Sequence, residues 1–264
     1  MKTKKLIIPY LLWMFLFTLV PLALIISNAF RNADGNFTLE FMSKALNYRE
    51  EFFYSLWVAF LSTTICLLLA YPLSYFISRS SERAQRTYTM LIMVPMWMNF
   101  LLRVRAWVLI LQNDGPVDSL LNIFGIDAQL MGNTTAVVLG MVYEFLPFMI
   151  LPLCTVMGKI DNNLIEAAQD LGCSKLNVIR KVVFPLSVPG IISGITMVFV
   201  PSASTFLVSQ YLGGPDNRMI GDIIEMLYKS DRNTASAIAL CLMIVILAFM
   251  VIMNRFGDEE AVGV

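Results

Sequence analysis

The sequence predicts an all-α membrane protein, a polytopic helical bundle with six transmembrane helices in a single domain over residues 1–264. Two observations support this fold class. Hydrophobic residues make up 58% of the chain and charged residues only 14%, and the mean hydropathy is +0.71. In addition, uncharged apolar stretches of roughly twenty residues, the length that crosses a hydrocarbon core, recur along the chain. This composition excludes an ordinary soluble domain.

Each predicted span is an apolar stretch bounded by charged or turn-forming residues. The six spans are placed at about Leu6–Ile26, within Phe52–Ser78, at about Thr87–Leu111, at about Thr135–Met157, within Val182–Asp216, and at about Ala235–Met253. Prolines inside several of them predict kinked helices, which are more typical of a transporter than of a simple anchor.

The distribution of basic residues predicts the orientation of the chain, because cytoplasmic loops retain Lys and Arg. If the N-terminus is inside, the inner segments hold eleven basic residues and the outer segments six. Both termini are therefore predicted to be cytoplasmic. The outer segments hold eleven acidic residues, and an acidic outer face gives weak support for a cationic substrate.

Charge and composition also exclude several functions. Nineteen basic and nineteen acidic residues cancel, so a nucleic-acid partner is not expected. The absence of histidine removes the commonest metal ligand and general base, and no metal site, cofactor or catalytic residue is predicted. The cysteines contain no paired motif and are interpreted as packing residues; they are Cys66, Cys154, Cys173 and Cys241.

The longest predicted cytoplasmic connection, at about 158–182, reads as two short helices. Asp161 or Asn162 can cap the first helix, and its apolar side is formed by Leu164, Ala167, Ala168 and Leu171. Gly172 suits the left-handed residue that ends it. Ser174 is expected to cap a second helix from Lys175 to about Val183, with Pro185 after its end. The small residues on one side predict a docking surface.

This segment resembles the signature E-A-A-x3-G-x9-I-x-L-P of permeases in ATP-driven (ABC) importers. The residues that match are Glu166, Ala167, Ala168, Gly172 and Pro185, while Val182 and Phe184 replace the usual Ile and Leu. The resemblance implies the type I (MetI-like) importer permease fold, a bacterial cytoplasmic (inner) membrane location, and a coupling helix that docks in a groove of an ATPase. Glu166 would be its polar anchor, with Ala167, Ala168 and Gly172 keeping the contact close.

Further motifs narrow the resemblance to the first-subunit permeases of spermidine/putrescine importers. They are Val94–Asn99 with Leu102–Arg103, Gly140–Phe148, Val188–Gly194, Tyr211–Gly214 and Ile220–Gly221. The resemblance implies a second homologous permease, two cytoplasmic ATPases that bind ATP and Mg²⁺, an external substrate-binding protein and a polyamine substrate. The chain has no Walker A motif, since Gly158–Lys159 is followed by Ile160, so it is not expected to hydrolyse ATP itself.

A polyamine site needs carboxylates for the ammonium groups and aromatic faces for the methylenes. The candidate substrate-path residues are Glu144, Tyr143, Trp97, Asn99, Asp216 and Asp222. Glu144 is the acid inside a predicted span, and a charge there is costly enough to be a functional candidate by default. It could equally pair with Arg103 or Arg105 and only stabilise the helix bundle. The two arginines are interpreted as structural, either snorkelling or paired with an acid.

Each remaining candidate also has a structural interpretation. Trp97 is more often a packing or interface residue, and a solvated loop charge is the simpler account of Asp216 and Asp222. For the whole chain, the alternatives are an importer of another solute, such as thiamine, a metal complex or an oxyanion, or an ATP-independent carrier. A membrane enzyme is not supported by any constellation of residues.

Overall fold

The structure, a computed structural model, describes residues 9–10, 12–32, 35–125 and 129–261. Five helices in these ranges are long and apolar enough to cross a membrane: Leu12–Phe30, Glu40–Ser78, Thr134–Met157, Lys175–Ser204 and Arg232–Phe256. A bent pair, Glu82–Trp97 with Phe100–Ile123, supplies a sixth. The predicted all-α bundle is confirmed. The predicted start of the first span at Leu6 lies outside the described residues.

Three helices form the centre of the bundle: α4 (Arg49–Ser78), α8 (Thr134–Met157) and α11 (Phe184–Ser204). The buried face of α4 is a stripe of small residues, which lets the helix backbones approach closely where packing drives association in lipid. This stripe contains Ser55, Ala59, Ser62, Cys66, Ala70 and Ser74. The Ser74 hydroxyl donates to the Ile150 carbonyl of α8 at 3.3 Å. Cys66 is fully buried, as expected for a packing residue.

Two glycines of α11 explain the sequence Val188–Gly194. A Cβ at Gly190 would lie 3.0 Å from the Val156 side chain, and one at Gly194 would lie 2.5 Å from the Met149 sulfur. Both distances are shorter than an ordinary carbon contact, so the absence of a side chain at these two positions of α11 favours its close approach to α8.

The third span, predicted at about Thr87–Leu111 with a kink at its proline, is divided into two helices. The chain forms α5 (Glu82–Met93), a 3₁₀ turn η3 (Val94–Trp97) and then α6 (Phe100–Leu111), with a bend of 88° between the two parts. Pro95 is the second residue of the turn, and the Asn99 side chain accepts the Leu101 N–H at 2.8 Å. A proline followed by a good N-cap therefore ends one helix and begins another.

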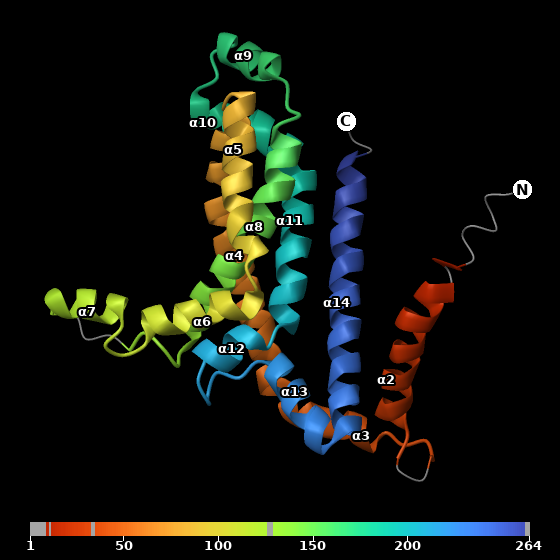
Figure 1. The fold of residues 1–264 in the computed structure, drawn as a ribbon. Coiled ribbons are helices and arrows are strands. Elements are labelled where there is room, and N and C mark those ends of the chain that lie inside the picture. The colour runs from red at the N-terminus through yellow and green to blue at the C-terminus, as the bar shows by residue number, and fades with distance from the viewer. Residues whose placement is uncertain (1–8, 11, 33–34, 126–128, 262–264) are drawn as a thin grey trace, which may run out of the picture.

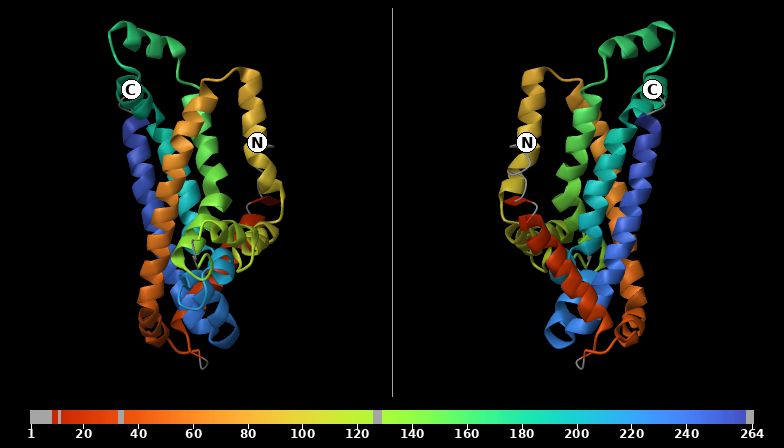
Figure 2. Two further views of the ribbon diagram at one scale, coloured as in Figure 1. Left: turned by 90° about the vertical axis from the view of Figure 1, so that its left-hand side faces the viewer. Right: turned by 90° about the vertical axis from the view of Figure 1, so that its right-hand side faces the viewer.

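The end of the bundle near α6 is built from short helices that lie across it. They are α6, α7 (Pro116–Ile123), α12 (Leu207–Leu212) and α13 (Ile220–Ser230), and Figure 1 shows them at the end opposite to α9. Two long helices run along the side of the core. The first is α14 (Arg232–Ala261). The second is α2 (Val20–Phe30), which follows a π-helical turn η1 (Phe15–Leu19) and packs against α14. Between them lie α3 (Glu40–Ala45) and the 3₁₀ turn η2 (Leu46–Tyr48). Figure 2 shows the central helices and α14 running side by side along the length of the molecule.

The connection after α8 contains α9 (Asn162–Asp170), α10 (Lys175–Val178) and a π-helical turn η4 (Ile179–Val183). The predicted second helix was expected to end before Pro185, but it continues through η4 into α11, giving one span over Lys175–Ser204. Pro185 occupies the first turn of α11. The missing N–H of a proline is tolerated there, since the widened turn before it already departs from α-helical hydrogen bonding.

Candidate functional site

The first candidate site is α9, which projects beyond the ends of α4, α5, α8 and α11 (Figure 1). The Asp161 carboxylate caps it by accepting the Asn163 N–H at 2.9 Å. Gly172 has φ +85°, the left-handed conformation that ends a helix and favours glycine. Ser174 caps α10 by accepting the Asn177 N–H at 3.4 Å. These local predictions are confirmed.

The predicted docking residues divide into an exposed group and a packed group. Glu166 and Ala167 are exposed, and Glu166 makes no hydrogen bond or ion pair with another described residue. Ala168 and Val182 instead pack against the apolar cluster of Ile160, Ile165, Val178 and Val183, which fastens α9 to the start of the fifth span. Ala168 and Val182 therefore support the hairpin, while Glu166 and Ala167 face outward.

Three leucines on the same hairpin are unusually exposed. The exposed fractions are 51% for Leu164, 87% for Leu171 and 75% for Leu176. Leu164 and Leu171 lie on or next to α9, beyond the ends of the spans, and Leu176 lies at the first turn of the fifth span. Such exposed apolar groups at one end of the molecule are typical of a protein interface. Leu176 was missed from the sequence, although its place two residues after the Ser174 cap puts it on the outer turn of α10.

The second candidate site is the charged pair inside the bundle. A guanidinium nitrogen of Arg103 lies 2.8 Å from a carboxylate oxygen of Glu144, and both side chains are buried. The pair joins α6 to α8 and supports the structural interpretation of Glu144. Arg105 is exposed and makes no ion pair with an acid among the described residues. Its guanidinium lies 4.7 Å from the centre of the Tyr211 ring.

The other predicted path residues of the third and fourth spans lie at the surface. Trp97 is 73% exposed and borders a pocket of about 440 Å³ beside Arg86 and Met93. The Asn99 side chain is engaged in capping α6. Tyr143 is 36% exposed and meets Trp107 edge-on, with 5.3 Å between the ring centres. Trp97 and Tyr143 therefore expose aromatic rings at the surface, whereas the Glu144 side chain is buried inside the bundle.

Tyr143 belongs to a narrow exposed stripe on an otherwise buried helix. Three exposed positions of α8 are spaced by four residues, namely Thr135, Leu139 and Tyr143, so they share one face. Thr155 is also exposed, but it lies twelve residues beyond Tyr143 and about 120° around the helix, outside this stripe. A central helix of a bundle that leaves one stripe uncovered has that face available for a partner subunit, for lipid or for a passage between subunits.

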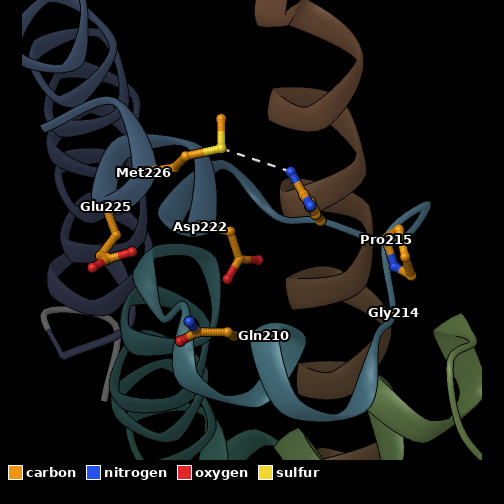
Figure 3. Close-up of a pocket in the computed structure, with 7 residues that line it drawn as sticks. Gln210, Gly214, Pro215, Asp222, Glu225 and Met226 are labelled. Carbon is orange, nitrogen blue, oxygen red and sulfur yellow. Dashed lines mark hydrogen bonds between the residues drawn. The ribbon is translucent and has the colours of Figure 1, made fainter. Parts of the chain in front are cut away.

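The third candidate site is a pocket of about 370 Å³ between α12 and α13. Figure 3 shows Asp222 and Gln210 approaching each other from these two helices, with Glu225 and Met226 further along α13. Arg218 also lines the pocket and donates to the Met226 sulfur at 3.7 Å. The pocket therefore contains charges of both signs. Asp216 is exposed and does not line it.

Asp222 is not the solvated loop charge that was expected. It lies in the first turn of α13, and one carboxylate oxygen accepts from the Ser209 hydroxyl at 2.6 Å and from the Met219 N–H at 2.9 Å. The other oxygen is buried without a partner among the described residues. Burial raises the pKa of Asp222, and the hydrogen bonds from Ser209 and Met219 oppose that rise.

We expect Asp222→Asn to keep or raise the thermal stability of the detergent-solubilised chain at pH 7. The pKa of Asp222 is higher in the folded chain than in the unfolded chain, so folding is disfavoured once the pH exceeds the pKa of the unfolded chain and Asp222 must ionise in its buried site. This loss of stability is still present at pH 7. The amide oxygen can still accept from Ser209 and Met219. The difference from the wild type should vanish at acidic pH, where Asp222 is protonated in both states, as unfolding curves at several pH values would show.

The matched variant Asp222→Ala removes the acceptor as well as the charge. It should lower stability by about 0.5–1.5 kcal/mol per lost hydrogen bond. Equal destabilisation by Asp222→Asn and Asp222→Ala would contradict the interpretation that Asp222 stabilises the fold through the hydrogen bonds it accepts and not through its charge.

Glycines around this pocket account for two of the sequence motifs. Gly214 has φ +68°, and a Cβ there would lie 3.1 Å from the backbone of Gly132. A Cβ at Gly221 would lie 2.7 Å from the Thr205 carbonyl oxygen. The Asn217 side chain, missed from the sequence, accepts from the Thr134 hydroxyl at 3.0 Å. These contacts fix the loop between α12 and α13 to the start of α8.

The fold and the exposed helical hairpin define a multi-pass membrane transport subunit. Residues 63–259 match the family described as "Binding-protein-dependent transport system inner membrane component". The chain belongs to this family and is an integral protein of the inner membrane. Its family members are transport subunits and not enzymes in their own right.

Named relatives and solved structures agree with this assignment. The chain is 34% identical over 232 residues to the spermidine/putrescine transport system permease protein PotB of Escherichia coli K12, covering 84% of each chain. It is 32% identical over 253 residues to the protein of that name from Haemophilus influenzae, covering 90% of this chain and 88% of the relative.

Chains of two solved ABC transporters share the fold. The fold matches a chain of a bacterial ABC transporter that imports alginate, with a TM-score of 0.79 at 17% identity, covering 97% of this chain and 95% of the other. It also matches a chain of the MetNI methionine ABC transporter, with a TM-score of 0.59 at 15% identity, covering 80% of this chain and 94% of the other.

Proposed function

We propose that this chain is a permease subunit of an ATP-driven importer that moves polyamines such as spermidine and putrescine into the cytoplasm. The observation that carries the proposal is the 32–34% identity over most of the chain to permeases named for these substrates. The exposed hairpin of α9 and α10 supplies a surface on which an ATPase can dock and drive transport. A polyamine also fits an outer surface that is rich in acidic residues and a membrane face with exposed aromatic rings.

The proposed assembly contains this chain, a second homologous permease, two cytoplasmic ATPases and an external binding protein. Binding of ATP and Mg²⁺ and hydrolysis of ATP belong to the ATPases. The end of the molecule that carries α9 faces the cytoplasm, in line with the bias of basic residues. The described ends of α2 and α14 nearest the chain termini point toward that same end (Figure 1), which supports two cytoplasmic termini.

Transport proceeds in this proposal by alternating access. ATP-driven closure of the two ATPases displaces α9, and the attached core helices rotate as a rigid body against the second permease. The exposed stripe of α8 with Tyr143, and the exposed Trp97, line the passage between the two permeases. Their rings supply faces for ammonium groups and methylenes. The Arg103–Glu144 pair holds α6 against α8 and does not contact substrate in the state described.

The test is uptake of labelled spermidine by cells that lack this chain and by cells in which it is restored. Unlabelled putrescine, thiamine and sulfate serve as competitors. We expect uptake to depend on the chain and to be blocked by putrescine alone among the competitors. Uptake blocked by thiamine or sulfate, or no chain-dependent uptake with all partners present, would contradict the polyamine assignment.

A further inference from the structure

Arg79 occupies the junction between the central helices and α9. It is the C-cap residue of α4, and its backbone N–H is bonded to the Tyr75 carbonyl at 3.2 Å. Its half-buried side chain leaves α4 and reaches the segment that joins α8 to α9. The guanidinium also lies 5.9 Å from the centre of the Tyr75 ring, which limits its freedom from the α4 side.

The Arg79 guanidinium donates to three acceptors beyond α4. One terminal nitrogen donates to the carbonyl of Met157, the last residue of α8, at 2.6 Å. The other donates to the Ile160 carbonyl at 3.2 Å and to the side-chain oxygen of Asn162, the first residue of α9. Carbonyls at a helix C-terminus lack partners within the helix and favour a cation. A single side chain therefore joins the ends of α4 and α8 to the start of α9.

Only an arginine has the geometry for this junction. Its planar fork points fixed N–H groups at separate acceptors, whereas the ammonium of lysine is one point charge on a flexible stem. The apolar cluster around Ile165 and Val178 already fastens α9 to the fifth span. Arg79 supplies the polar attachment to the other two central helices.

We propose that Arg79 is a positioning residue for energy coupling, because it makes α4, α8 and the start of α9 move as one body when an ATPase displaces α9. This inference rests on the proposed function of α9 as the docking helix. Loss of the guanidinium leaves α9 able to bind the ATPase through its exposed face, but its direct attachment to α8 is then only the short link after Gly158, and the apolar cluster connects it to α8 indirectly, through the fifth span. ATP is hydrolysed while the passage fails to open fully.

The experiment uses the complete transporter in proteoliposomes and measures ATP hydrolysis and labelled spermidine uptake in the same vesicles. For Arg79→Gln we expect hydrolysis to continue while uptake per ATP falls by about 5–150-fold, the usual range of coupling between sites. Arg79→Lys keeps the charge and should restore the ratio only in part. The control is Arg83→Gln, an equal charge change on exposed α5, where no hydrogen bond or ion pair of the side chain is seen within the described residues.

The ratio of uptake to hydrolysis separates coupling from folding, because a folding defect lowers both rates in proportion. An unchanged ratio in Arg79→Gln overturns this inference, provided that the wild type shows ATP-dependent uptake. Absence of that uptake in the wild type counts against the proposed function instead. If Arg79→Gln does not assemble, Asn162→Ala decides the matter by removing only the acceptor on α9, where a lowered ratio supports the role of Arg79 and an unchanged ratio overturns it.

Discussion

Replacing Glu166 with arginine is expected to abolish ATP-driven uptake while the chain stays folded in the membrane. Glu166 is exposed on α9, and an added arginine there touches no part of the core. In the proposed complex this carboxylate meets the ATPase groove, and like-charge contacts at an interface cost several kcal/mol, equivalent to at least about a hundredfold weaker docking. Co-purification of the ATPase with a tagged permease, measured beside spermidine uptake, would show the loss directly.

The matched control for this change is Glu82→Arg. Glu82 is also exposed, and it begins α5 at the end of the bundle predicted to face the cytoplasm, so the charge change and the side of the membrane are the same. We expect the Glu82→Arg chain to co-purify with the ATPase as the wild type does and to retain most of the spermidine uptake. Normal co-purification of the ATPase with the Glu166→Arg chain would refute the docking assignment, and equal loss in both variants would point to a nonspecific effect of charge.

The sequence was sufficient to predict the helices and much of the hairpin, because both depend on local signals. Apolar length alone locates five spans, and the caps at Asp161 and Ser174 and the turn at Gly172 are properties of single residues with their neighbours. A kink at Pro95 was predicted, but the break into two helices at Val94–Asn99 was missed, because a proline inside an apolar run often only kinks a helix. Here the Asn99 cap turns the kink into a new helix, and its capping role was visible in the sequence.

The candidate sites were less predictable, since their character depends on which helices meet. Glu144 had two equal interpretations until the packing of α6 on α8 placed Arg103 against it. Asp222 follows a glycine-rich loop and looked solvated, but the loop folds back so that Ser209 and Met219 enclose its carboxylate. The junction made by Arg79 joins residues about eighty positions apart in sequence, and no local pattern indicates such a contact.

The second large effect is expected at the buried pair of Arg103 and Glu144. Glu144→Gln leaves the arginine charge buried without a counter-charge, and breaking a buried pair from one side typically costs about 3–5 kcal/mol. We expect a strong fall in the yield and thermal stability of the folded complex, measured by fluorescence-detected gel filtration after heating. Arg105→Gln is the control, because this neighbouring arginine is exposed and its ring contact with Tyr211 is worth only about 0.5–1 kcal/mol.

The double variant Arg103→Gln with Glu144→Gln separates a structural pair from a substrate-binding carboxylate. Replacing both members of a buried pair by well-packed apolar residues of similar volume is often neutral, since neither charge remains to be desolvated, and two glutamines likewise leave no buried charge. The two amides can also hydrogen-bond to each other, so the double variant should be more stable than either single variant, a coupling that a double-mutant cycle measures. If the pair only fixes α6 on α8, the double variant regains spermidine uptake together with its fold. A double variant that folds well but takes up no spermidine would instead place the Glu144 carboxylate on the substrate path, reached after the pair opens during transport.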